Sequence, residues 1–98
     1  MNIELLHVHD CPNRTEARRN LDAALARVGI DAVVYERVVT SPELAVAMGM
    51  NGSPTILIDG IDPFGADASA SLGCRLYRDA TGVRGAPSIE ALTARLAS

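Results

Sequence analysis

The hydrophobic positions along this chain fall into short runs that alternate between two periodicities. Ile3 to Val8 is a mostly apolar run of strand length, typical of a strand that is covered on both faces. From Asn13 onward the apolar residues recur at helical spacing, and Gly29 follows in the position where glycine commonly ends a helix. The chain therefore begins with a predicted buried strand and an amphipathic helix.

The same alternation continues through the middle of the chain. Residues 32–39 are rich in valine, which favours a second strand. Ser41 and Gly49 bracket a short helix, because serine is a preferred N-cap and glycine a preferred terminator. Residues 55–58 form an apolar third strand, and Ser88 opens a last helix.

The region between residues 61 and 87 has no clear periodicity. We place one more strand there, over the Cys-Arg-Leu-Tyr-Arg segment at residues 74–78. Strands that alternate with helices predict a layered α/β domain with right-handed crossovers. We therefore expect a single domain over residues 1–98, with about four strands and three helices.

Composition excludes several classes of protein. The formal net charge is −3, and no dense basic patch is interleaved with aromatic residues, so we expect no nucleic-acid partner. No run approaches the roughly 18 to 20 apolar residues of a membrane span. Two cysteines form neither a secreted disulfide framework nor a metal cluster. These features predict a cytoplasmic monomer that needs no metal and no cofactor.

Cys11 is the leading candidate for chemistry. It lies between the first apolar run and the start of the first helix, where unpaired N–H groups and the helix dipole favour a thiolate. Arg14, one turn into the helix, can add positive charge near the sulfur, whereas Asp10 opposes it. The alternatives are that Cys11 is a small buried hydrophobic residue and that Arg14 is simply solvated.

The other candidate residues each allow two interpretations. Cys74 can resolve an oxidised Cys11 through a long-range disulfide, or it can be a strand residue that faces the core. The neighbouring Arg75, Tyr77 and Arg78 can offer donors to an anion or point to solvent.

The histidines near Cys11 are also ambiguous. His7 and His9 would share a strand face if the first strand extends that far, and a Cys/His pair can generate a nucleophile or bind a soft metal. A half-buried strand histidine and a polar loop histidine are the alternative.

Two motifs carry a resemblance to the thioredoxin-like superfamily. Cys11-Pro12-Asn13-Arg14 after the first strand resembles the thioredoxin Cys-x-x-Cys site with Arg14 in place of the second cysteine. Gly52-Ser53-Pro54-Thr55 resembles the cis-proline loop that faces the active-site cysteine in that superfamily. The Asp-Cys-Pro-Asn site and the later Cys-Arg-Leu-Tyr-Arg segment are also similar to small bacterial proteins of the DF family of (seleno)proteins.

The resemblance implies a thioredoxin-like fold with a central mixed β-sheet and a cis Ser53–Pro54 bond before the third strand. It also implies a monothiol redox protein, a possible thiol-disulfide oxidoreductase, in which Cys11 is the nucleophile and Cys74 or a low-molecular-weight thiol resolves the intermediate. The substrate would be a disulfide or an oxidised thiol of a protein or a small molecule. The substrate-binding residues would be Pro12, Arg14, Ser53, Pro54 and Thr55.

A second class of function fits the same residues. Because the local partner cysteine is replaced by Arg14, the domain can instead be a non-catalytic thioredoxin-like binding module for a protein partner or a soft metal.

Overall fold

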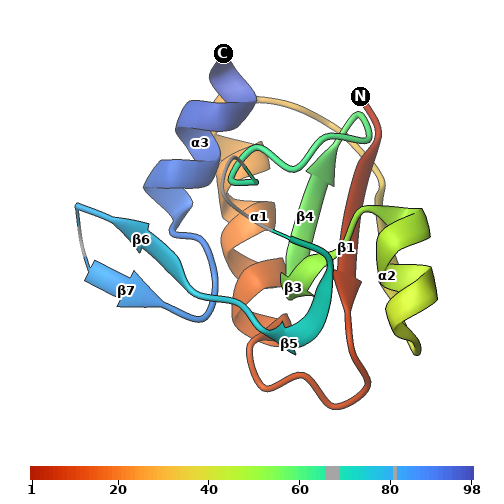
Figure 1. Cartoon of the computed structure of the whole chain (residues 1–98). Coiled ribbons are helices and arrows are strands. Elements are labelled where there is room, and N and C mark those ends of the chain that lie inside the picture. Colours follow the sequence, from red (N-terminus) through yellow and green to blue (C-terminus); the bar gives the residue numbers. More distant parts are fainter. Residues whose placement is uncertain (66–68, 81) are drawn as a thin grey trace.

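Three helices pack around short strands in the computed structural model, which describes residues 1–65, 69–80 and 82–98 (Figure 1). The helices are α1 (Arg14–Val28), α2 (Pro42–Met48) and α3 (Ile89–Ala97). The sequence predicted all three. Within the described ranges, no helix is both long and apolar enough to cross a membrane.

A three-stranded mixed sheet forms the centre of the fold. Its strand order is β2 (Val34–Val38), β1 (Ile3–His7), β4 (Thr55–Ile58). β1 pairs in parallel with β2, across the α1 connection, and antiparallel with β4. The mixed sheet is confirmed, but in the described part of the chain it has three strands rather than the expected four or so.

The remaining strands form two small pairs outside the central sheet. β3 (Asn51–Ser53) pairs in parallel with β5 (Ser71–Cys74), and β6 (Tyr77–Asp79) forms a hairpin with β7 (Gly82–Arg84). The prediction of one strand over residues 74–78 is wrong, because the side chain of Arg75 turns into the protein interior between β5 and β6. Because the short strand β3 comes before Pro54, the strand that follows Pro54 is the fourth in chain order and not the third.

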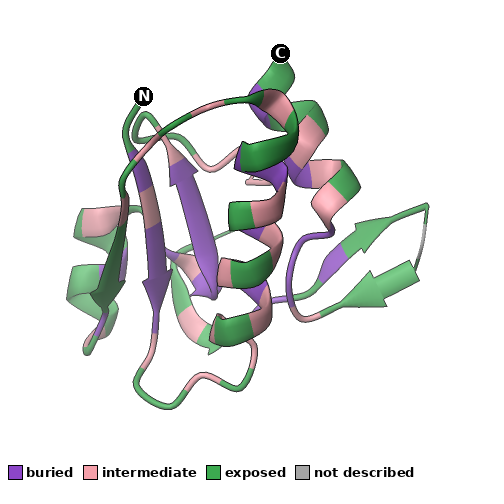
Figure 2. Cartoon of the chain, turned by 180° about the vertical axis from the view of Figure 1, so that it is seen from behind, coloured by how far each residue is buried: buried purple, intermediate pink, exposed green. Residues whose placement is uncertain are grey.

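Apolar side chains of the sheet form a core on each face. Ile3 and Leu5 of β1 pack with residues of α1 and α3, whereas Leu6 belongs to a second cluster with Ala45 of α2. This alternation follows from the strand period of two. Figure 2 shows the buried residues concentrated in β1, β4 and the inner faces of the helices. Burying each such side chain contributes about 1.5 to 3 kcal/mol to stability.

Candidate functional site

Cys11 lies in the loop between β1 and α1, and its thiol is free and partly exposed. Its backbone N–H donates to the Val8 carbonyl oxygen at 3.3 Å, and its carbonyl oxygen accepts from the Arg14 N–H at 3.3 Å. These two bonds fold the loop tightly, so that Cys11 lies two residues before Asn13, the N-cap of α1.

The N-terminus of α1 differs from those of the other two helices. Ser41 and Ser88 cap α2 and α3 by accepting from the N–H groups of residues three positions later, at 3.2 and 3.1 Å. Asn13, the N-cap of α1, makes no such side-chain hydrogen bond. The first-turn N–H groups of α1 therefore lack a side-chain acceptor at the end of the helix where Cys11 lies.

Close packing explains why Asn13 does not cap its helix. The segment after β7 runs against the Asn13 side chain, and a Cβ atom at position 85 would lie 2.3 Å from Asn13 Nδ2. Only Gly85 permits this approach. The Asn13 side chain is thus turned toward Gly85 and leaves the helix N-terminus open.

The Pro54 loop is joined directly to the end of β1. The Ser53–Pro54 peptide bond is cis. Ser53 Oγ accepts a hydrogen bond from the Val8 N–H at 3.0 Å, across 45 positions of sequence. Because Val8 O also accepts from the Cys11 N–H, one residue links the Pro54 loop to the Cys11 loop. The two motifs that the sequence analysis singled out are therefore neighbours in the structure.

The side chains of the Pro54 loop face the protein interior. Ser53 is 2% exposed, Thr55 is 0% exposed, and Pro54 is also fully buried. Thr55 Oγ1 donates to the Gly52 carbonyl oxygen at 2.6 Å and accepts from the Asn51 N–H at 3.1 Å. In this structure the three expected substrate-binding residues thus hold the loop in shape and offer no side chain to solvent. Of the other two, Pro12 is exposed and Arg14 is partly exposed.

Arg75 and Tyr77 support the Pro54 loop from the other side. The Tyr77 hydroxyl donates to the Pro54 carbonyl oxygen at 2.5 Å, and the Arg75 N–H donates to the Ser53 carbonyl oxygen at 3.1 Å. The Arg75 guanidinium forms an ion pair with Asp62 and also donates to Thr55 Oγ1 at 3.3 Å. Arg75 and Tyr77 are buried, so the interpretation of both as donors to an external anion is wrong.

Burial and nearby charges both affect the pKa of Tyr77. Burial strongly raises the pKa of Tyr77 and the positive charge of Arg75 lowers it, while the negative charges of Asp62 and Cys11 raise it. The pKa of Tyr77 is raised overall, so its hydroxyl keeps the proton that it donates to the Pro54 carbonyl oxygen.

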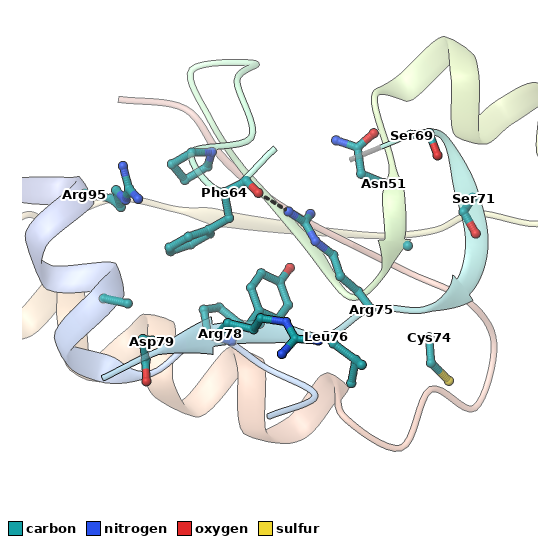
Figure 3. A pocket seen from close by; sticks show the side chains of 15 residues that line it. Asn51, Phe64, Ser69, Ser71, Cys74, Arg75, Leu76, Arg78, Asp79 and Arg95 are labelled. Atoms are coloured by element: carbon teal, nitrogen blue, oxygen red, sulfur yellow. Dashed lines mark hydrogen bonds between the residues drawn. The ribbon is translucent and has the colours of Figure 1, made fainter. Parts of the chain in front are cut away.

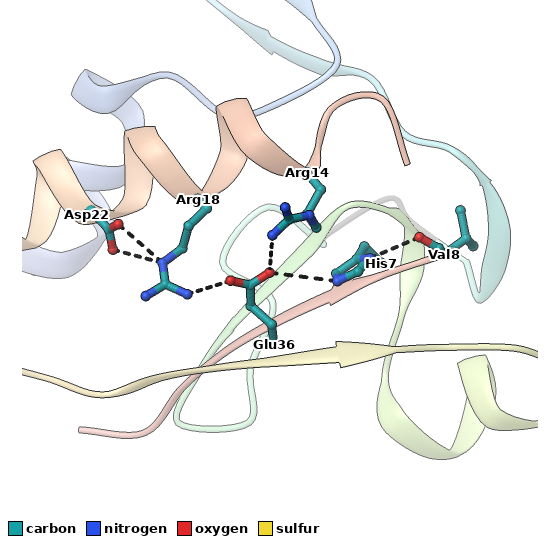
Figure 4. Close-up of polar contacts among 6 residues, drawn as sticks. All are labelled: His7, Val8, Arg14, Arg18, Asp22 and Glu36. Carbon is teal, nitrogen blue, oxygen red and sulfur yellow. Dashed lines mark hydrogen bonds and ion pairs between the residues drawn. The ribbon is translucent and has the colours of Figure 1, made fainter. Parts of the chain in front are cut away.

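A cluster of charges between α1 and the edge strand β2 engages Arg14. Figure 4 shows Glu36 of β2 between Arg14 and Arg18 of α1. Arg14 Nη1 lies 2.7 Å from Glu36 Oε1, and Arg18 Nη1 lies 2.6 Å from Glu36 Oε2. Arg14 thus pairs with Glu36, so its positive charge is shared with that carboxylate and does not act on the Cys11 sulfur alone.

His7 and His9 have different surroundings. His7 is 8% exposed, with Nδ1 2.9 Å from the Val8 carbonyl oxygen and Nε2 3.8 Å from Glu36 Oε1. His9 lies outside β1, in the exposed loop, and its Nε2 is 3.4 Å from Asp10 Oδ2. The condition for a shared strand face is not met, because β1 ends at His7, and the alternative of a strand histidine and a polar loop histidine is what the structure has.

Cys11 and the two histidines line a hollow of about 400 Å³ together with Asp10, Arg14 and Thr15. Its rim is polar and open. Within the described part of the chain, no group of three or more His, Cys, Asp or Glu side chains is arranged to hold a metal ion.

Cys74 lies at the end of β5, in register with Ser53 of β3, and its thiol is free and exposed. Cys74 lines a separate, larger hollow of about 690 Å³. The two cysteines thus open into different hollows, and no disulfide joins them in this structure.

Comparisons with known proteins identified no relative of this chain. No protein family, no curated protein and no solved structure gave a significant match. Functional proposals must therefore be supported by the geometry of the site.

Proposed function

We propose that this chain is a thioredoxin-like, monothiol redox protein in which Cys11 is the nucleophile. The observation that carries the proposal is the link between the Cys11 loop and the Pro54 loop, made by Val8 through Ser53 Oγ and the Cys11 N–H. A cysteine at the start of a helix, next to such a loop, has the surroundings of a reactive thiol.

The open end of α1 supports the same role. The N-cap Asn13 leaves the first-turn N–H groups without a side-chain acceptor, and the positive end of the helix dipole favours an anion there. Cys11 is also partly exposed, which a nucleophile requires. A buried structural cysteine would not combine these features.

The proposed reaction starts with attack of the Cys11 thiolate on one sulfur of a substrate disulfide. A bond forms between Cys11 Sγ and that sulfur while the substrate S–S bond breaks, and the other substrate sulfur leaves as a thiolate that takes up a proton. Cys11 is then held in a mixed disulfide.

Release needs a second thiol, because Arg14 occupies the position of the usual local partner and pairs with Glu36. Attack by Cys74 on Cys11 Sγ would free the substrate thiol and leave a Cys11–Cys74 disulfide for an external reductant. Attack by a low-molecular-weight thiol on the mixed disulfide would instead return the Cys11 thiolate and release a disulfide.

The buried residues of the Pro54 loop act in this proposal as supports. Ser53 and Thr55 fix the loop through their hydroxyl groups, and Tyr77 fixes the Pro54 carbonyl. The substrate would then contact the exposed Pro12 and the polar rim of the hollow around Cys11.

Two single variants, Cys11→Ser and Cys74→Ser, test the proposal. Reduction of hydroxyethyl disulfide is followed with a low-molecular-weight thiol as electron donor. We expect Cys11→Ser to abolish protein-dependent turnover. If Cys74 resolves the intermediate, Cys74→Ser accumulates a mixed disulfide at Cys11 that mass spectrometry detects. Unchanged turnover in Cys11→Ser would refute the proposal.

Alkylation by uncharged iodoacetamide separates the redox protein from the non-catalytic binding module. Cys74 is the more exposed thiol, so accessibility alone predicts faster alkylation there. The proposal predicts the opposite order near neutral pH, because the surroundings of Cys11 favour the thiolate. A slower reaction at Cys11, resolved by site with mass spectrometry, would favour the binding module.

A further inference from the structure

The larger hollow, of about 690 Å³, lies between the hairpin, α3 and the β3–β5 pair, away from the hollow around Cys11. Its volume is in the range of pockets that hold small molecules. Apart from Cys74, the exposed side chains that line it take no part in the proposed redox step or in the Pro54 loop.

Two arginines give this hollow a positive lining. Figure 3 shows Arg95 on the α3 side of Phe64 and Arg78 on the β6 side. Both side chains are exposed, and neither forms an ion pair with any residue in the described ranges. Among the described residues of the lining, one carries a carboxylate, Asp79, whose Oδ2 accepts from Ser88 Oγ at 2.6 Å. A positive lining on a chain of net charge −3 favours an anionic ligand.

The inner wall of the hollow is aromatic. The Phe64 and Tyr77 rings meet edge to face, with centroids 5.5 Å apart. The Arg95 guanidinium lies 5.2 Å from the centroid of Phe64, which holds it beside this wall. Arg75 adds no net charge here, because it is paired with Asp62. The wall therefore offers apolar contact close to a fixed positive charge.

We propose that this hollow binds a small organic anion, a carboxylate with a flat apolar part. The carboxylate accepts hydrogen bonds from Arg95, which lies beside Phe64, and the flat part packs against Phe64 and Tyr77. Arg78, on the other side of the hollow in Figure 3, attracts the anion through its charge. This binding does not involve Cys11, and the site shares only Cys74 with the proposed redox chemistry.

Cys74 provides a reporter for this site, because it is exposed and lies on the wall of the hollow. Its thiolate attacks one sulfur of an aromatic disulfide, forms a mixed disulfide and releases one aromatic thiolate, whose absorbance gives the rate. Dithiobis(nitrobenzoate) carries a carboxylate on each ring, whereas dithiodipyridine is uncharged at neutral pH. All measurements use Cys11→Ser, so only Cys74 reacts.

We expect Arg78→Gln and Arg95→Gln each to slow the reaction with dithiobis(nitrobenzoate) about threefold and to leave that with dithiodipyridine unchanged. The factor follows from the loss of one charge a few ångströms from the anion at high dielectric. Arg84→Gln is the matched control, because Arg84 is exposed on the same hairpin but does not line the hollow. Equal effects of all three variants on the anionic reagent would show only general surface charge and would overturn the proposal.

Protection by a free carboxylate tests binding without covalent chemistry. Nitrobenzoate has no thiol, and we expect it to slow the reaction of Cys74 with dithiodipyridine in a saturable way. Arg78→Gln/Arg95→Gln should weaken this protection about tenfold. Absence of protection at millimolar nitrobenzoate would overturn the proposal. Because Cys11 is absent throughout, neither result bears on the proposed redox function.

Discussion

At the scale of single residues, the two tyrosines of this chain show how burial changes the role of a side chain. Tyr35 is 50% exposed on the edge strand β2. Tyr77 is 7% exposed and uses its hydroxyl to hold the Pro54 carbonyl oxygen at 2.5 Å. A buried tyrosine combines apolar packing with one polar contact, and here that contact supports the candidate site.

Tyr77→Phe should destabilise the protein by about 1 to 2 kcal/mol, because it leaves the buried Pro54 carbonyl without its donor. Urea unfolding near neutral pH measures this loss. Tyr35→Phe is the control, and it should change stability by less than about 0.5 kcal/mol because Tyr35 is exposed. Equal effects of the two substitutions would argue against a structural role for the Tyr77 hydroxyl.

The same residue should make stability depend on alkaline pH. Burial raises the pKa of Tyr77 in the folded state above the value of 10.0 expected for a free tyrosine. The resulting stabilisation is complete below about pH 10, and it is lost at higher pH as the unfolded chain ionises first. The wild-type protein should therefore lose more stability than Tyr77→Phe between about pH 9 and pH 11. Parallel losses in the two proteins would contradict this assignment.

At the scale of secondary-structure elements, Glu36 joins α1 to β2. Its carboxylate accepts from Arg14 and Arg18, one turn apart on the helix. Although partial burial raises the pKa of Glu36, the hydrogen bonds and charges of the two arginines outweigh it and lower the pKa overall. The two ion pairs with Arg14 and Arg18 thus favour the ionised form of the Glu36 carboxylate in the folded state.

Glu36→Gln should remove an acid-sensitive part of the stability. Because the pKa of Glu36 is lowered in the folded state, its contribution is present above the unfolded value of 4.5 and is lost as the pH falls through the folded value. The side chain is 26% exposed, so we expect at most about 1 kcal/mol, reduced further by salt. Urea midpoints near pH 7 and near pH 3 measure the difference between the two proteins. Asp31→Asn, in the exposed turn before β2, is the control.

Elements with a local signal were predictable from the sequence. Ser41, Gly49 and Ser88 marked helix ends correctly, because capping depends on residues only a few positions apart. The apolar run over β4 was also correct. The strand expected over residues 74–78 failed at Arg75, since its alternating pattern cannot reveal that the side chain pairs with Asp62 in the interior.

At the scale of the whole molecule, the Arg75–Asp62 ion pair connects segments that are distant in sequence. Both side chains are buried, at 7% and 6% exposure. Arg75 also donates to the Phe64 carbonyl oxygen at 2.8 Å, and Asp62 accepts from Asn51 Nδ2 at 2.9 Å. The pair therefore ties the segment after β4 to the start of β3 and to the connection between β5 and β6.

The candidate site was predictable only in part for the same reason. Cys11 and Pro54 carry recognisable motifs, and the structure brings their loops together through Val8. The supporting roles of Arg75, Tyr77 and Gly85 depend on contacts across the fold, which no local pattern in a single sequence records. Ser53 and Thr55 were expected at a substrate surface, yet their hydroxyl groups satisfy buried backbone groups instead.

A double-mutant cycle on the Arg75–Asp62 ion pair measures how strongly the two side chains are coupled in stabilising the fold. Arg75→Met should cost about 3 to 5 kcal/mol, because it leaves the Asp62 carboxylate buried without its positive partner. Arg75→Met/Asp62→Leu should cost less than Arg75→Met alone, since the uncompensated charge is then removed together with its partner. Arg78→Met is the control. Because Arg78 is exposed, this substitution should change stability by less than about 0.5 kcal/mol. Thermal and urea unfolding of the wild type, Arg75→Met, Asp62→Leu and Arg75→Met/Asp62→Leu give the coupling energy. Strictly additive costs would mean that the two side chains act independently.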